Sequence, residues 1–129
     1  MKKTLLTVLL VFISNISFAF DKEAFCRSNI KSDTSRAEWG IKMRNEMFSK
    51  CKGNIDVCAK PYLKRINDQE EKDKLDAIEI FNRQNYPQAE RLFLLTMISS
   101  MTTSALMGFK YEGKTANQIA LENYSFCLK

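Results

Sequence analysis

An uncharged stretch near the C-terminal end of the chain limits its possible folds more than any other feature. The residues "LFLLTMISSMTTSALMGF" lie between Arg91 and Lys110 without a charged side chain among them. A run of this kind either crosses a membrane or forms the central helix of a water-soluble bundle. Its eighteen residues are at the short end of what the hydrocarbon core of a bilayer requires.

The apolar and hydroxyl side chains of this stretch separate on a helical wheel, at about 100° per residue. One side carries Leu94, Met97, Ile98, Met101, Ala105 and Gly108, and the other carries Thr96, Ser99, Ser100 and Thr103. A helix surrounded by lipid has no reason to separate its hydroxyl groups. A helix packed among other helices does, because small hydroxyl side chains allow close approach and bond to backbone carbonyls. We therefore expect a buried helix, with a membrane span through residues 92–109 as the alternative.

The first half of the mature chain carries helical rather than strand patterns. It shows no sustained alternation of apolar and polar residues and no Asn-Gly or Asp-Gly turn. We expect a short helix in "FDKEAFCRSNIK", a break at "SDTS" and a second helix over residues 35–49. Ser35 and Glu38 have the spacing of a capping box at the start of this second helix. Trp39, Met43 and Met47 then form an apolar stripe along it.

Proline and glycine mark further helix boundaries. Pro61 predicts a nearby helix start, because proline lacks the N–H that an interior helical position donates, and "NYP" predicts the end of the polar helix before it. The expected inward residues of this region are Tyr62, Leu63, Ile66, Leu75, Ile78 and Phe81. Gly108 is predicted to close the long apolar helix, and Thr115 with Gln118 to open the last one.

The N-terminal residues "MKKTLLTVLLVFISNISFAF" have the parts of a secretory signal peptide. Lys2 and Lys3 form the positive region, residues 5–13 form the apolar core, and Ser17 and Ala19 are small residues placed for cleavage before Phe20. We predict a signal peptide over residues 1–19, a helical domain over residues 20–129, and a periplasmic or secreted protein.

Four cysteines fit this compartment, where disulfides form and persist. Three pairings are possible. We favour Cys51–Cys58, because Gly53 and Asn54 allow a tight turn between them, and Cys26–Cys127, which joins the first and last helices. A metal site is not expected, because the closest pair of cysteines has six residues between its members and the chain has no histidine. The predicted fold class is thus an all-α, single-domain bundle of five to six helices cross-linked by two disulfides.

The charge of the chain is unevenly distributed. Removing the signal peptide leaves 18 basic and 15 acidic residues, too mild an excess for nucleic-acid binding. Residues 42–65 are mainly basic and residues 68–79 mainly acidic. Such runs are usually solvated helix faces, but they also form docking surfaces for a partner of opposite sign. The candidate partner-binding residues are Lys60, Lys64, Arg65, Glu70 and Glu71, with Phe109 and Tyr111 of "FKYEGK" as exposed aromatic residues, unless both rings fold over the core.

The sequence offers little for catalysis. Without histidine there is no Ser-His-Asp triad, and the four glycines form no phosphate-binding loop. One enzymatic hypothesis is a cell-wall hydrolase with Glu38 and Glu46 as its carboxylate pair and Trp39 stacked on the sugar. Any helical chain with this many acidic residues offers such pairs, so no catalytic residue is assigned and no cofactor is expected.

The last part of the chain, "ALMGFKYEGKTANQIALENYSFC", resembles small exported α-helical, disulfide-containing proteins of Gram-negative bacteria whose function is not established. In these proteins an aromatic turn leads into a Thr-x-x-Gln/Glu helix start, and a terminal cysteine pairs with one near the mature N-terminus. The resemblance implies a helical fold and a Cys26–Cys127 bond, and it implies no active residues. The Cys51–Cys58 loop departs from the simplest form of the pattern.

Small, cofactor-free helical proteins of this compartment often bind other proteins. The function predicted is therefore a protein-binding module, such as an inhibitor, an immunity protein or an envelope accessory protein, with another envelope or secreted protein as partner. The alternatives are the carboxylate hydrolase and the membrane-associated protein.

Overall fold

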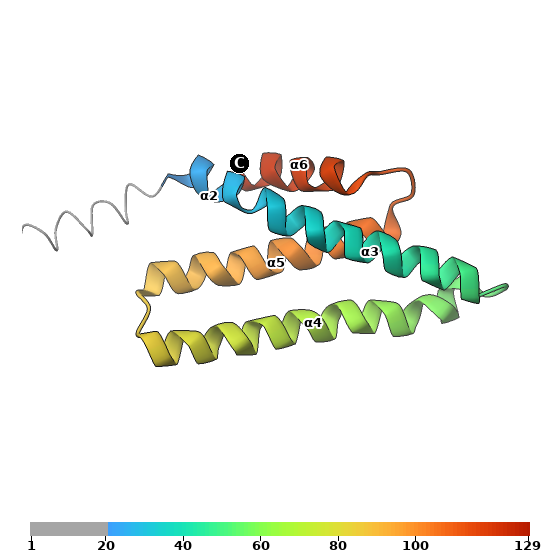
Figure 1. The fold of residues 1–129 in the computed structure, drawn as a ribbon, viewed down its shortest axis with the longest axis horizontal. Helices are drawn as coiled ribbons and strands as arrows, with labels where there is room; N and C mark the ends of the chain where they lie inside the picture. Colours follow the sequence, from blue (N-terminus) through green and yellow to red (C-terminus); the bar gives the residue numbers. More distant parts are fainter. Residues whose placement is uncertain (1–20) are drawn as a thin grey trace, which may run out of the picture.

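The computed structural model describes residues 21–129, and every regular element in this range is a helix. The helices are α2 (Lys22–Ser28), α3 (Ile30–Lys50), α4 (Ile55–Gln84), α5 (Gln88–Lys110) and α6 (Ala116–Cys127). Figure 1 shows α5 in the middle, with α4 antiparallel on one side and α3 and α6 on the other. The predicted signal peptide over residues 1–19 lies outside the described residues.

The prediction of five to six separate helices is slightly too high. Only Asn29 lies between α2 and α3, and its own backbone is helical, with φ −79° and ψ −17°. The two segments therefore run into each other at a shallow bend (Figure 1). In spatial terms residues 21–129 form four helical rods, and the all-α class with two disulfides is confirmed.

The expected break at "SDTS" is wrong, because α3 runs through it from Ile30. Hydrogen bonds of the side chains stabilise the helix here: the Thr34 hydroxyl donates to the Ile30 carbonyl at 2.7 Å, and Ser100 of α5 donates to the Asp33 carboxylate at 2.9 Å. Ser35 is consequently an interior residue of the helix, and its predicted capping box with Glu38 does not form.

Helix α4 begins six residues before Pro61, where the sequence predicted a start near the proline itself. The Asn54 side chain caps it by accepting from the Val57 N–H. Tyr62, Ile66 and Phe81 face inward as predicted. Leu75 and Ile78 were expected inward but are exposed, because α4 contacts the rest of the molecule along a single narrow stripe.

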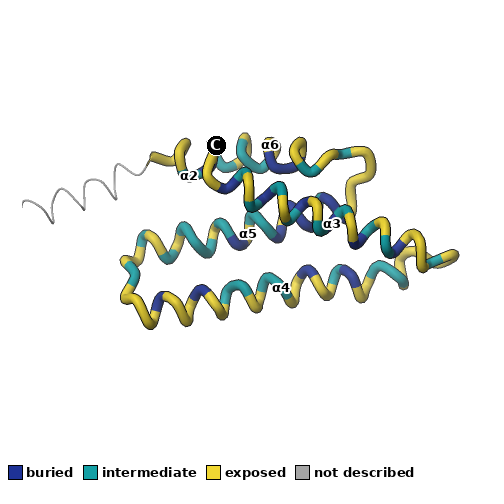
Figure 2. Tube along the Cα trace, in the orientation of Figure 1, coloured by how far each residue is buried: buried dark blue, intermediate teal, exposed yellow. Residues whose placement is uncertain are grey.

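Helix α5 starts after Pro87 as predicted, but it passes through Gly108 and ends at Lys110. Gly108 and Gly40 allow α3 and α5 to cross in backbone contact. A Cβ on Gly40 would lie 2.0 Å from the Ala105 carbonyl oxygen, and a Cβ on Gly108 would lie 2.4 Å from the Ala37 carbonyl oxygen. Gly108 is thus a packing residue and not a helix cap. Figure 2 shows the buried residues concentrated where α3 and α5 cross.

By length and composition α5 is the one helix among the described residues that is able to cross a membrane, and a third of its most apolar window is buried in the fold. Core helices of soluble proteins pass the same test. In the structure α5 contacts α3, α4 and α6, which is the arrangement of a central bundle helix. Its exposed residues include Thr96, Ser99 and Thr103, as the helical wheel predicted.

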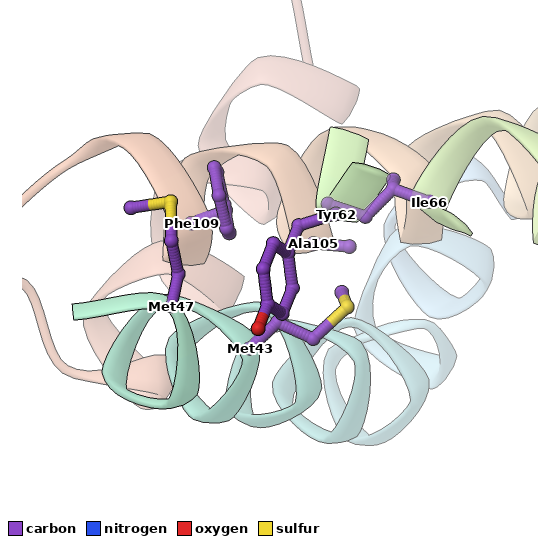
Figure 3. Packing of buried hydrophobic residues seen from close by; sticks show 6 residues of the cluster. All are labelled: Met43, Met47, Tyr62, Ile66, Ala105 and Phe109. Carbon is purple, nitrogen blue, oxygen red and sulfur yellow. The ribbon is translucent and has the colours of Figure 1, made fainter. Parts of the chain in front are cut away.

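The main core lies where α3, α4 and α5 meet. Its buried members are Met43, Met47, Tyr62, Ile66, Ala105 and Phe109, shown together in Figure 3. Tyr62 of α4 and Phe109 of α5 stack with ring centroids 6.0 Å apart. A second, smaller cluster near the α4–α5 turn contains Ala77, Phe81 and Ile98. Burial of these side chains is the main force that holds the helices together.

The structure contains both of the disulfides that the sequence analysis favoured. Cys26 of α2 bonds to Cys127 at the end of α6, and Cys51 bonds to Cys58 across the α3–α4 connection. The described residues leave no free cysteine. Two such bonds are consistent with an oxidising compartment.

Candidate functional site

The α3–α4 connection forms a projecting end of the molecule, which we call the disulfide tip (residues 48–65) (Figure 1). Three of its large apolar side chains are exposed: Val57 is 58% exposed, and Phe48 and Ile55 are each 43% exposed. Beside the disulfide the tip contains a shallow cavity of about 470 Å³, whose lining includes Val57, Pro61 and Arg65. Exposed apolar side chains that lie close together make this end a candidate binding surface.

Local hydrogen bonds and the cross-link fix the backbone of the tip. The Cys51 N–H donates to the Met47 carbonyl at 2.8 Å and ends α3, and the Asn54 cap starts α4 three residues later. Pro61 has no N–H, so the Val57 carbonyl receives no helical hydrogen bond at this position. Cys51 and Cys58 also pack against the main core, which holds the tip to the bundle.

The tip has a strong positive charge. Residues 48–65 contain five basic residues and one acidic residue, a net charge of +4. Lys50 pairs with Glu46 at 2.8 Å, and Lys64 pairs with Asp68 at 2.6 Å. Among the described residues, Lys52 and Lys60 form no ion pair, and the Arg65 guanidinium contacts only the face of the Tyr62 ring, at 5.9 Å from its centroid. Unpaired positive charge therefore surrounds exposed apolar side chains.

The acidic segment differs, because internal ion pairs satisfy most of its charge. Asp73 accepts from Arg36 of α3 at 2.8 Å, which ties α4 to α3. Lys74 pairs with Glu70 at 2.7 Å and reaches Glu71 at 4.0 Å. Glu70 is half-buried and Glu71 is exposed. Within residues 68–79 only Asp76 among the acidic side chains forms no ion pair, so the basic surface keeps more unpaired charges than the acidic one.

The two aromatic candidates separate in the structure. Phe109 is 5% exposed and stacks on Tyr62 in the core, so it is not a surface residue, and the alternative of core packing holds for it. Tyr111 is exposed, and the Lys114 ammonium lies 5.3 Å from its ring centroid. The next residue, Glu112, pairs with Arg44 of α3 at 3.3 Å, which brings this turn toward the C-terminal part of α3.

The geometry gives no support to a carboxylate hydrolase. Glu38 and Glu46 lie eight residues apart on α3, a rise of about 12 Å, beyond the range of about 5–9.5 Å found for glycosidase carboxyl pairs. Trp39 lines a cavity of about 540 Å³ between α3 and α4, but neither glutamate does. Lys50 donates to Glu46 and lowers its pKa, which is the opposite of what a general acid requires.

A buried polar cluster between α3 and α5 was not predicted. Asp33 is 2% exposed, and burial raises its pKa to about 6, an effect that the hydrogen bond from Ser100 partly offsets. The Asn123 amide of α6 donates to the Ser100 carbonyl at 3.2 Å and to the Ser104 hydroxyl. Because "SDTS" resembles a polar break in the sequence, nothing in the pattern marked Asp33 as a buried group.

The ionised Asp33 should make the stability of the protein depend on pH. Its folded pKa is above the value of about 3.9 expected in the unfolded chain, so the folded state binds the proton more tightly. The free energy of unfolding should therefore decrease by about 2 kcal/mol between pH 4 and pH 6 from this group. Asp33→Asn should stabilise the protein at pH 8 by a similar amount and lose this advantage at pH 4. Urea unfolding at both pH values measures the difference.

The control for this prediction is Asp76→Asn, at an exposed position on α4. It should leave the pH dependence almost unchanged. If the free energies of unfolding of Asp33→Asn and of the parent chain differed by the same amount at pH 4 and at pH 8, the account of Asp33 would be contradicted.

Residues 21–129 contain no group of three or more side chains placed to hold a metal ion. The chain matches no family model, no curated protein and no solved structure. The disulfide tip is therefore interpreted from its own geometry and charge.

Proposed function

We propose that this chain is an exported protein-binding module whose disulfide tip docks onto an acidic surface of another envelope or secreted protein. The observation that supports this most is the exposed Val57, which lines the same cavity as Arg65 and lies one helical turn before Lys60, on a backbone that Cys51–Cys58 fixes. An apolar centre with a charged rim is the usual anatomy of a protein interface.

The two parts of the tip have different roles in this proposal. Basic side chains without internal partners attract an acidic surface over a distance and speed the encounter. The apolar side chains of Phe48, Ile55 and Val57 then lose their contact with water and supply the binding energy. A fixed backbone reduces the entropy lost on binding, because the loop is already ordered before the partner arrives.

The same features favour a protein over other anionic partners. The net positive charge is concentrated in the tip. The mature chain as a whole carries only a small basic excess, which is little for a polyanion such as a nucleic acid. The functional classes that use such a surface are an inhibitor, an immunity protein or an accessory subunit. Each of these acts by binding.

Photo-crosslinking in living cells tests the proposal. A photoreactive amino acid replaces Val57 in the tip and, as the matched control, Leu75, another exposed apolar residue of α4. Leu75 lies about 27 Å further along the helix. We expect a discrete adduct with one other protein from Val57 and none from Leu75.

Charge reversal separates specific docking from random contact. The double substitution Lys60→Glu and Arg65→Glu should decrease the yield of the adduct from position 57 at least about tenfold, because each reversed charge repels an acidic surface. Lys72→Glu, at an exposed position of the acidic segment, should leave it unchanged. Adducts of equal yield from both positions, adducts with lipid or a second copy of the chain, or no response to charge reversal would each contradict the proposal.

A further inference from the structure

A second cavity lies at the other end of the bundle, beside the Cys26–Cys127 disulfide. Its volume is about 380 Å³, toward the lower end of the range for small-molecule sites. The start of α3, the hydroxyl-bearing side of α5 and the end of α6 form its walls. No charged side chain is among its lining residues, and Phe126, which is 77% exposed, stands beside it.

Two buried oxygen atoms, one on a residue of this cavity's wall and one a helical turn further along α3, have no hydrogen-bond donor among the described residues. Asn29 lines the cavity and is 4% exposed, yet its Oδ1 atom is unpaired. Asp33 follows one turn later on the same face of α3, and its Oδ1 atom is also unpaired. Ser100 lines the cavity and donates to the other carboxylate oxygen of Asp33. A buried acceptor without a donor costs about 1–3 kcal/mol, so a ligand that supplies donors gains this energy.

Most of the donor groups of the walls are already engaged within the protein. The hydroxyls of Thr96 and Thr103 donate to the carbonyls of Leu92 and Ser99, at 2.8 and 3.0 Å. The Asn123 amide donates to Ser100 and Ser104. The cavity thus presents mainly acceptor oxygens, with the negative charge of Asp33 directly behind Ser100.

We propose that this cavity binds a small organic cation, in which a primary ammonium group is attached to an apolar body. The ammonium donates to Asn29 Oδ1 and lies near the Asp33–Ser100 pair, and the apolar body lies against the Phe126 ring. An ammonium group has three donors and no acceptor, which matches walls rich in acceptors. An aromatic face also attracts a cation. This site is independent of the disulfide tip.

The test uses the mature chain with both disulfides formed, at pH 7.5, and two probes that differ in charge. Titration with 2-phenylethylamine should produce saturable NMR shifts at the amides of Asn29, Ser100 and Asn123. The neutral isostere 2-phenylethanol should bind at least about tenfold more weakly, because it lacks the charge and two of the three donors.

Variants make the test specific to the site. Asp33→Asn keeps the shape of the side chain and should decrease the preference for the amine over the alcohol to less than about threefold. Phe126→Ala should weaken amine binding several-fold and, being at an exposed position, should leave the fold intact in an amide spectrum. Arg65→Glu in the tip should not change the affinity for the amine.

Some results would overturn the inference. These are no saturable shift at the cavity residues up to millimolar amine, equal binding of amine and alcohol, or unchanged preference in a folded Asp33→Asn variant. Loss of tip crosslinking has no bearing on this site, so the two proposals fail separately.

Discussion

Replacing Cys26 and Cys127 together by alanine should lower the free energy of unfolding by about 4–5 kcal/mol. The bond joins residues separated by 101 positions, and a cross-link over so long a loop removes much of the entropy of the unfolded chain. It also holds α2, whose other contacts are with α3, with α6 and, through the Phe25 ring 4.9 Å from that of Phe93, with α5. Urea denaturation of the oxidised parent and the double variant measures the loss.

The other disulfide supplies the matched comparison. Cys51 and Cys58 are separated by only seven positions, so their double alanine variant should lose about 2–3 kcal/mol. A domain of this size has a total stability of about 5–15 kcal/mol. The Cys26/Cys127 variant should therefore be close to unfolding, whereas the Cys51/Cys58 variant should stay folded. If the Cys26/Cys127 variant lost less free energy of unfolding than the Cys51/Cys58 variant, this description would be contradicted.

Gly40→Ala should destabilise the protein by about 3 kcal/mol, the upper end of what overpacking usually costs. The added Cβ would lie 2.0 Å from the Ala105 carbonyl oxygen, which is backbone and has no rotamer to change. The helices have to separate, and side chains along the α3–α5 contact then lose packing. In an exposed helix the same substitution would stabilise by up to about 1 kcal/mol, so the sign of the effect is informative.

Two further variants complete this experiment. Gly108→Ala should destabilise for the same reason, since its Cβ would meet the Ala37 carbonyl. The loss of stability in the double variant should be smaller than the sum of the losses in the two single variants, because the first substitution already moves the helices apart. Asn45→Ala, at an exposed position of α3, is the control and should be neutral or stabilising. A Gly40→Ala protein as stable as its parent would show that the helices do not cross this closely.

The parts of the fold that were predictable are those that local chemistry determines. The Tyr86–Pro87 boundary follows from the steric limits of proline, and α4 indeed ends at Gln84, followed by Asn85 in a left-handed conformation. The Thr115–Gln118 capping box opens α6 as expected, with both of its hydrogen bonds formed. The two faces of α5 followed from its periodicity.

The wrong predictions concern residues whose role depends on distant parts of the chain. "SDTS" was expected to break a helix, but Asp33 accepts a hydrogen bond from Ser100, which is 67 positions away. Gly108 was expected to end α5, but it lies against Ala37 of α3. Leu75 and Ile78 fit an inward stripe, yet no other helix covers them. Such tertiary contacts leave no trace in local periodicity.

The candidate site was predictable in its charge but not in its details. The excess of basic residues around Lys60 and Arg65 is visible in the sequence. That the acidic segment pairs internally is not visible, because Arg36 and Asp73 meet only when α3 packs on α4. The position of Phe109 also depends on the tertiary structure. Because α5 continues to Lys110, further than the sequence suggested, Phe109 lies on the helix and faces the core.

The central claim is that α5 is the core of an oxidised, water-soluble bundle outside the cytoplasm. Fractionation of cells that make the chain with its own N-terminal segment, followed by thiol alkylation without and with reductant, tests it most directly. The account predicts release by osmotic shock, no alkylation before reduction and four alkylated cysteines after it. A protein that stays in the membrane through alkaline carbonate extraction, or one with four free thiols before reduction, would contradict the claim.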